Sequence, residues 1–241
     1  MGEMKENLGR YSLFLVIQII ILISKFTIFN DGVSDIMAKK TLQLASGTSI
    51  LGGIVLFFLS PLLASYLATI NKNILLGKRK ELGAELKEGL SYYWRVLGGT
   101  LLIALIIFGV TIGMSLIALI PILGILGFIV GLLFMVYVVV IYSTISEAIV
   151  FRECGVSEGM DTCKAVSKEH FWTLFLLSVP VGISNIISAR AGGVVVLVSI
   201  SIIIMLYSIF AAYYRITLVS RVFGGDENEV IEEKEDGYPG I

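Results

Sequence analysis

The sequence predicts an all-α fold: a polytopic membrane helical bundle of about six transmembrane helices, with two interfacial amphipathic helices on the cytoplasmic side. Hydrophobic residues make up 56% of the 241 residues and charged residues only 15%, against roughly 45–50% and 25% in soluble domains. No Asp, Glu, Lys, Arg or His occurs between Arg95 and Glu147, which leaves room for two crossings of about 20 residues each. A buried hairpin of a soluble protein is the alternative, but four further long apolar runs would then need polar covering that the chain lacks.

The first predicted span covers residues 11–29 and follows the basic residues Lys5 and Arg10. A secretory signal peptide also begins with a basic flank and an apolar run, but no small-residue cleavage pattern follows this one. We therefore expect a retained helix. The other five spans are expected at residues 48–70, 96–118, 121–146, 171–189 and 193–216.

Two features shape the third and fourth spans. Pro121 suits the first turn of a helix, where its missing N–H costs nothing. Each span also contains a G-x-x-x-G motif, at Gly109 and Gly113 and at Gly127 and Gly131. Small residues four apart let helix backbones approach closely, so we expect these two spans to cross closely near their shared turn.

Two polar segments between spans each predict an amphipathic helix in the membrane interface. The first covers residues 71–93, where apolar side chains recur at spacings of four, four and three on one helical face. Its stripe consists of Leu82, Leu86, Leu90 and Tyr93. The second lies within Glu147–His170 and begins at Ser157, a residue type that caps helices. Helices of this kind place their apolar face in the lipid and their polar face in water.

A shift of 78 residues lays the first polar segment on the second, and Trp94 then meets Trp172. We therefore predict a parallel repeat of residues 48–118 and 121–189. Tryptophan is enriched at headgroup depth because its ring is amphipathic. Both tryptophans are expected as interfacial anchors.

Basic residues predict the orientation, because they stay on the cytoplasmic side. Six spans put both ends and both polar segments together, and that side carries fourteen of the 18 Lys and Arg residues. We therefore expect a multi-pass protein of the cell membrane with cytoplasmic N- and C-termini. The basic residues of the other side are Lys25, Lys39, Lys40 and Arg190.

Residues 1–225 are expected to form the membrane domain and residues 226–241 a disordered acidic tail, because the tail holds too few apolar side chains to fold alone. The tail offers a docking segment for a protein partner. Membrane lipids are the other expected partners. A net charge of −1 gives no field that attracts nucleic acid, and the oligomeric state stays open.

Few residues suggest chemistry, so we expect no enzyme, no catalytic residue, no metal and no cofactor. The chain has one His, its two Cys fit no common metal-ligand spacing, and its glycines lack the context of a phosphate loop. Polar groups inside spans are costly unless they serve a purpose, which singles out Gln18, Asn185, Glu147 and Arg190 as candidate sites. Asn185 is either a substrate or ion ligand or an interhelical hydrogen-bonding group.

Residues 147–159 read EAIVFRECGVSEG and are followed by a polar helix and Phe171-Trp172. This arrangement resembles the membrane domain that accompanies some glycerophosphoryl diester phosphodiesterases, and related uncharacterised six-helix prokaryotic membrane proteins. In those enzymes a separate soluble domain, rich in His and paired acids, performs the chemistry. The catalytic domain is absent from this sequence, so the resemblance implies a membrane fold and supplies no catalytic residue.

Two functions are compatible with these observations. The first expectation is a non-enzymatic protein that organises the membrane by binding lipids or partner proteins. The alternative is a transporter or channel subunit for a lipid-like or small apolar solute. A continuous polar cavity that reaches Gln18 or Asn185 would favour transport, and a dry bundle would favour membrane organisation.

Overall fold

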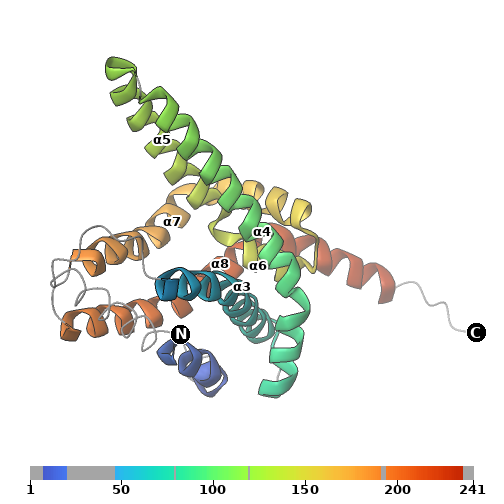
Figure 1. Cartoon of the computed structure of the whole chain (residues 1–241). Helices are drawn as coiled ribbons and strands as arrows, with labels where there is room; N and C mark the ends of the chain where they lie inside the picture. The colour runs from blue at the N-terminus through green and yellow to red at the C-terminus, as the bar shows by residue number, and fades with distance from the viewer. Residues whose placement is uncertain (1–7, 21–46, 79, 119, 191–193, 236–241) are drawn as a thin grey trace, which may run out of the picture.

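The computed structural model describes residues 8–20, 47–78, 80–118, 120–190 and 194–235, and every regular element in these ranges is helical (Figure 1). The predicted all-α class is therefore confirmed for the described residues. The elements are η1 (Leu8–Tyr11), α3 (Gly47–Leu75), α4 (Leu82–Ile117), α5 (Pro121–Ile141), η2 (Tyr142–Thr144), α6 (Ile145–Arg152), α7 (Val156–Arg190) and α8 (Val194–Glu235). η1 leads into a short apolar helix, and the helical stretch Gly9–Ile20 includes that helix and most of η1.

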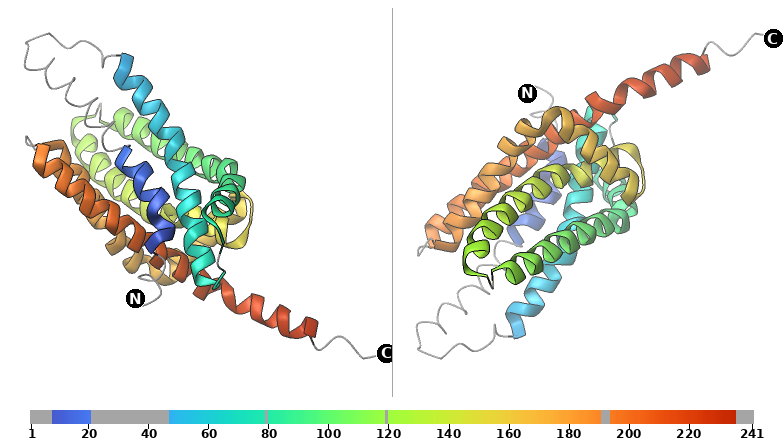
Figure 2. Two further views of the ribbon diagram at one scale, coloured as in Figure 1. Left: turned by 90° about the horizontal axis from the view of Figure 1, so that it is seen from below. Right: turned by 90° about the horizontal axis from the view of Figure 1, so that it is seen from above.

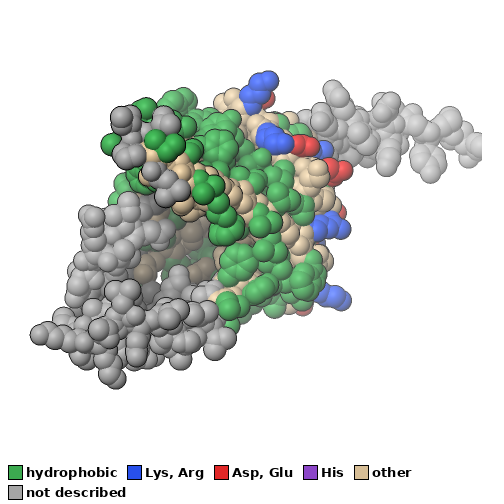
Figure 3. Space-filling model, turned by 45° about the horizontal axis from the view of Figure 1, so that its top comes forward, with side chains coloured by type: hydrophobic (Ala, Val, Ile, Leu, Met, Phe, Trp, Pro, Cys, Tyr) green, Lys and Arg blue, Asp and Glu red, His purple; other side chains and the backbone are tan. Residues whose placement is uncertain are grey.

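Three of the described helical stretches are long and apolar enough to cross a membrane: Leu82–Ile117, Gly124–Arg152 and Ser201–Gly224. The most apolar part of the first has no buried residue. On the face drawn in Figure 3, hydrophobic side chains cover most of the described surface, and charged side chains gather along one edge. An apolar exterior with charge at one end is the pattern of a membrane protein, because lipid replaces water around the apolar surface.

α3 extends beyond the span predicted over residues 48–70 and ends at Leu75. The prediction that residues 71–75 begin an interfacial helix is wrong. The three polar residues there, Asn71, Lys72 and Asn73, are buried because each has a side-chain partner from another part of the chain. These long-range partners allow polar side chains to stay on a packed helix.

α4 is one continuous helix of 36 residues, where the sequence predicts an interfacial helix followed by a separate third span. No proline interrupts it. At about 1.5 Å per residue it is roughly 54 Å long, which exceeds the roughly 30 Å of hydrocarbon in a bilayer, so its first turns extend beyond the hydrocarbon. Leu82, Leu86 and Leu90 face outward there, and the opposite side, including Glu85 and Gly89, is buried.

α5 begins at Pro121, the residue at which the sequence predicts the fourth span to start. That span is predicted to continue unbroken to residue 146, but the 3-10 turn η2 interrupts it and α6 resumes the course to Arg152. Hydrogen bonds from other elements stabilise the break: Ser167 of α7 donates to the Ile141 carbonyl and Arg215 of α8 to the Ser143 carbonyl.

α7 contains the second polar helix and the predicted fifth span as two parts joined at His170, whose φ of −124° and ψ of 27° are not helical. The polar part precedes this residue and the apolar part begins at Phe171. The sequence places the boundary between interfacial helix and span at the same residue.

α8 continues as a helix to Glu235, and its last turns project from the bundle (Figure 2). This differs from the disordered tail expected from residue 226 onward. A helix that is already formed extends without the cost of a new nucleus, and Glu and Lys are good helix formers. Residues 236–241 lie outside the described part.

α6 is the central element of the packed end, where it contacts α3, α4, α7 and α8. Five of its eight residues are buried apolar side chains, including Ala148, Ile149 and Val150 at 0% exposure. The α4–α5 hairpin instead projects from this end (Figure 1). α6 is therefore held in position by contacts with four other helices, and the residues at its C-terminal end are held with it.

Candidate functional site

Charged side chains that the packed end buries are paired across helices. Arg10 pairs with Glu85 of α4, Lys72 of α3 pairs with Glu153 after α6, and Arg215 of α8 lies 3.4 Å from Glu147 of α6. A buried charge is tolerated only with a partner and hydrogen bonds. The packed end is thus connected by ion pairs as well as by apolar contacts.

Lys72 occupies the centre of the pairing around the end of α6. Its Nζ donates to the Val150 carbonyl at 3.0 Å and to Glu153 Oε1 at 2.6 Å. It also lies 5.8 Å from the centroid of the Tyr92 ring, where a cation is attracted to the aromatic face. The ammonium of Lys72 is therefore held in place by groups of α4 and α6.

Glu153 ends α6 in the left-handed conformation, with φ of 54°. Helices commonly end in this way, but usually with glycine, because a side chain there is strained. The hydrogen bond and charge of Lys72 hold the pKa of the Glu153 carboxyl below its usual value. The carboxylate is therefore ionised at neutral pH and remains the partner of Lys72.

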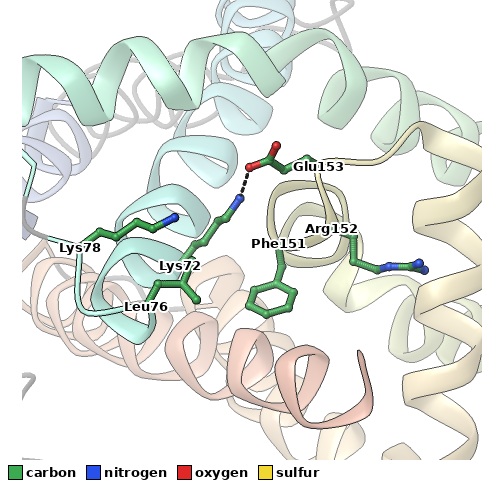
Figure 4. Close-up of a pocket in the computed structure, with 6 residues that line it drawn as sticks. All are labelled: Lys72, Leu76, Lys78, Phe151, Arg152 and Glu153. Carbon is green, nitrogen blue, oxygen red and sulfur yellow. Dashed lines mark hydrogen bonds and ion pairs between the residues drawn. The ribbon is translucent and has the colours of Figure 1, made fainter. Parts of the chain in front are cut away.

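A cavity of ≈ 310 Å³ opens beside this pair. It is lined by Lys72, Leu76, Lys78, Phe151, Arg152 and Glu153 (Figure 4). Lys78 extends toward the same space as Lys72, whereas Arg152 is directed away from it (Figure 4). Arg152 donates to Thr162 Oγ1 at 3.0 Å and lies over the Phe223 ring. We call this cavity the Lys72 pocket.

A hydrogen bond connects the Lys72 pocket to the residue that follows an exposed tryptophan. Arg95 Nη1 donates to the Glu153 carbonyl at 2.8 Å, and the preceding residue, Trp94, is 75% exposed. Tryptophan prefers the headgroup layer. The pocket therefore opens near the depth at which phospholipid headgroups are expected.

A second groove, of ≈ 410 Å³, lies between α3 and α4. It is lined by Ile54, Val55, Phe58, Leu59, Leu62, Leu90 and Tyr93. Most of these side chains are exposed. Such a groove is suited to a hydrocarbon chain rather than to a polar ligand.

No protein-family model, curated protein or solved structure matches the chain. The resemblance to the membrane domain of glycerophosphoryl diester phosphodiesterases therefore stays a prediction.

The predicted site residues lie on four different helices, α4, α6, α7 and the helix Gly9–Ile20. Gln18 is half-buried on the helix Gly9–Ile20. Glu147 is buried, and Ser146 donates to its Oε2 at 2.7 Å. Asn185 and Arg190 belong to the last turns of α7, but their side chains lie outside the described residues. Trp94 and Trp172 are 75% and 73% exposed.

Sequence reasoning did not find the Lys72 pocket. Its signal is a charged residue between two asparagines directly after a long apolar run, Asn71-Lys72-Asn73. A membrane helix that ends on three polar residues can either enter the headgroups or bury them against partners. Only the fold shows that Glu153, which lies 81 residues along the chain, is the partner of Lys72.

The thiols and acids of the described part do not form a reactive or metal-binding cluster. Within the described ranges no group of three or more His, Cys, Asp or Glu is placed to hold a metal ion. Cys154 and Cys163 are buried and not joined in a disulfide. Burial raises the pKa of both thiols, to about 12 for Cys163, so both stay protonated and unreactive at neutral pH.

Proposed function

We propose that this chain is a non-enzymatic, six-span protein of the cell membrane that organises its surroundings by binding lipids, with both termini in the cytoplasm. The observation that carries the proposal is the Lys72 pocket, a cationic cavity that opens near an exposed tryptophan and beside exposed apolar surface. Polar and cationic groups bind headgroups, and apolar side chains contact hydrocarbon.

The six proposed spans are three helical stretches that are clearly long and apolar enough, two further apolar helices, and the segment that begins with the helix Gly9–Ile20. Three stretches have the length and apolar character of a span. α3 and the part of α7 after His170 supply two more apolar helices, and the helix Gly9–Ile20 begins the segment predicted as the first span. Residues 21–29 of that span lie outside the described part.

Exposed side chains of the α4–α5 hairpin support a lipid environment. Large apolar side chains point outward along both helices. Those of the hairpin that are more than 60% exposed include Leu105, Phe108, Leu116, Ile125, Val130 and Leu133. A contiguous apolar surface of this kind is unfavourable in water and costs nothing in hydrocarbon. The hairpin is therefore suited to direct contact with lipid chains.

The test is to identify lipid that stays with the protein. After gentle solubilisation and purification, mass spectrometry should find anionic phospholipid enriched relative to the source membrane, because the Lys72 pocket carries excess positive charge. An unrelated multi-pass protein purified in the same detergent is the control. A lipid composition equal to that of the source membrane would contradict the proposed function.

The acidic residues after Gly225 are proposed as a docking segment for a protein partner. They follow the packed part of α8, and the helix continues away from the bundle to Glu235 (Figure 2). Truncation after Gly225 should remove any protein that co-purifies in stoichiometric amount. Unchanged recovery of such a protein would exclude the docking role.

A further inference from the structure

We propose that the Lys72 pocket binds the phosphate group of an anionic phospholipid, which displaces the Glu153 carboxylate from Lys72. This inference rests on the proposed function and names its ligand. Lys72 and Lys78 are the residues that contact the phosphate, and Glu153 is the counter-ion that occupies the place of the ligand when no lipid is bound.

Charge favours an anion in this pocket. Of the four charged side chains that line it, Lys72, Lys78 and Arg152 are positive and only Glu153 is negative. Arg152 is engaged with Thr162 and Phe223 and is directed away from the cavity (Figure 4). It therefore adds positive potential, whereas the two lysines are placed to donate hydrogen bonds.

The Lys72–Glu153 pair is asymmetric in a way that allows exchange. The Lys72 side chain is 6% exposed and the Glu153 side chain is 62% exposed. Rotation of the carboxylate into solvent breaks its hydrogen bonds to Lys72 and to the Tyr92 side chain, and it displaces no buried apolar group because the Glu153 side chain is mostly exposed. Lys72 cannot follow, because its Nζ also donates to the Val150 carbonyl. An ammonium has three donors, so one stays directed at the cavity after the carboxylate leaves.

The position of the pocket favours a lipid over a soluble phosphate ester. Leu76 lines the cavity and is 41% exposed, and Phe151 lines it as well. The Glu153 carbonyl accepts a hydrogen bond from Arg95, directly after the exposed Trp94. A phospholipid bound here places its phosphate between the lysines, and its acyl chains contact the neighbouring apolar side chains. A soluble phosphate ester has no acyl chains and gains nothing from those side chains.

Native mass spectrometry of the full chain in a neutral detergent tests the proposal, with phosphatidic acid as the probe and phosphatidylcholine as the reference lipid. The wild-type protein should prefer phosphatidic acid. K78Q should weaken its binding about fivefold, since a basic residue near a lipid surface contributes about that factor. E153Q should strengthen binding by a similar factor, because it removes the competing carboxylate. K87Q, an exposed lysine of α4 outside the pocket, is the matched control and should bind as the wild type does.

Lys78 is exposed and forms no ion pair within the described part of the chain, so K78Q should fold as the wild type does. E153Q removes the charge partner of the buried Lys72, so its lipid affinity is compared only after circular dichroism shows the helix content of the wild type; if E153Q does not fold, K78Q against K87Q decides the proposal. If K78Q and E153Q bind phosphatidic acid as the wild type does while anionic lipid still co-purifies, the pocket is not the site and only this inference is overturned. If the wild-type protein shows no lipid preference at all, the proposed function is overturned as well.

Two further arms identify the occupant. Glycerol phosphate and inorganic phosphate should bind at least tenfold more weakly than phosphatidic acid; equal binding would show that the site takes a soluble phosphate and would overturn the lipid assignment. Truncation after Gly225 should leave lipid affinity unchanged. If truncation increased lipid affinity as much as E153Q does, the acidic segment rather than Glu153 would be the group that competes with lipid, and the proposed role of Glu153 would be overturned.

Discussion

Two residues in the left-handed conformation set the turns that bring Lys72 and Glu153 together. Gly77, with φ of 65°, follows α3, and Glu153, with φ of 54°, follows α6. Glycine adopts this conformation without cost, whereas a side chain costs about 1–2 kcal/mol. At Glu153 the ion pair with Lys72 offsets part of this strain. Glu153 therefore both ends α6 and neutralises the charge of Lys72.

Replacing Gly77 with alanine should lower the free energy of unfolding by about 1 kcal/mol. An added Cβ meets no atom within 4 Å, so the whole effect comes from the backbone conformation. The matched control is Gly83→Ala in the first turn of α4, where a Cβ also meets nothing and alanine should stabilise by up to about 1 kcal/mol. Unfolding in detergent micelles measures both, and shifts of the same sign would contradict the assignment.

Replacing Glu147 with alanine should destabilise the protein by about 3 kcal/mol, since Arg215 then keeps its place near α6 without its carboxylate. Glu147 is 3% exposed, so water cannot easily replace it. Asp161→Ala removes the exposed pair with Lys164 and should leave the unfolding midpoint unchanged. Equal midpoints for the two variants would show that the buried pair does not hold α6 against α8.

At the residue scale, the sequence predicted helix boundaries that depend on local residues, but it did not predict which charged residues form pairs. Proline at the first turn locates the start of α5, and the change from polar to apolar side chains at His170 locates the break in α7. Both signals act within a few residues. Lys72, Glu153 and Arg215 act across the bundle, and their sequence neighbours do not indicate whom they pair with.

Among the elements, α3 and α4 approach each other most closely at a glycine outside the predicted motifs. A Cβ on Gly89 would lie 2.9 Å from Tyr66 Cα. In the α4–α5 hairpin, a Cβ on Gly127 or Gly131 would clash with Ile117 or Met114, whereas Gly109 and Gly113 face open space. The close crossing near the shared turn therefore depends on the glycines of α5 alone.

Gly89→Ala should destabilise the protein by about 1–3 kcal/mol, because the new methyl group meets backbone atoms of α3 that cannot rotate away. Gly109→Ala is the control on the same helix and should be neutral or slightly stabilising. Thermal unfolding monitored by helical circular dichroism separates them. A stable Gly89→Ala variant would mean that α3 and α4 can move apart without loss.

Element boundaries were predicted less well than element types. The sequence separates an interfacial helix from the third span, and α4 joins them because no residue between Leu82 and Ile117 requires a break. Conversely, η2 interrupts a segment predicted as one helix, and the polar run Tyr142-Ser143-Thr144 was its only local indication. The break depends on hydrogen bonds donated by residues of α7 and α8. The order of residues along the chain does not show that these donors lie beside it.

At the scale of the whole molecule, the face drawn in Figure 3 divides into a mostly apolar described surface and one edge where charged side chains gather. The division supports the proposed topology, with the basic residues on the cytoplasmic side. The Lys72 pocket, the start of α4 and the polar part of α7 all belong to the packed end. In the proposed topology, the Lys72 pocket faces the cytoplasmic leaflet.

Cysteine labelling in intact cells tests this orientation. A cysteine introduced at the exposed Lys78 should react with a membrane-impermeant maleimide only after permeabilisation, whereas one at Lys40, which the sequence places on the other side, should react at once. The native Cys154 and Cys163 are buried and should stay unlabelled until the protein unfolds. Immediate labelling at Lys78 would invert the topology.

The carbonyls at the break between α5 and α6 accept hydrogen bonds from segments that the ribosome delivers later, namely Ser167 and Arg215. Until those segments emerge, the carbonyls have no protein donor from α7 or α8, and hydrocarbon penalises such groups by several kcal/mol each. The nascent α4–α5 hairpin should therefore keep this end hydrated and reach its final depth only after α8 has been synthesised, which makes the arrival of α8 the step that seals the bundle.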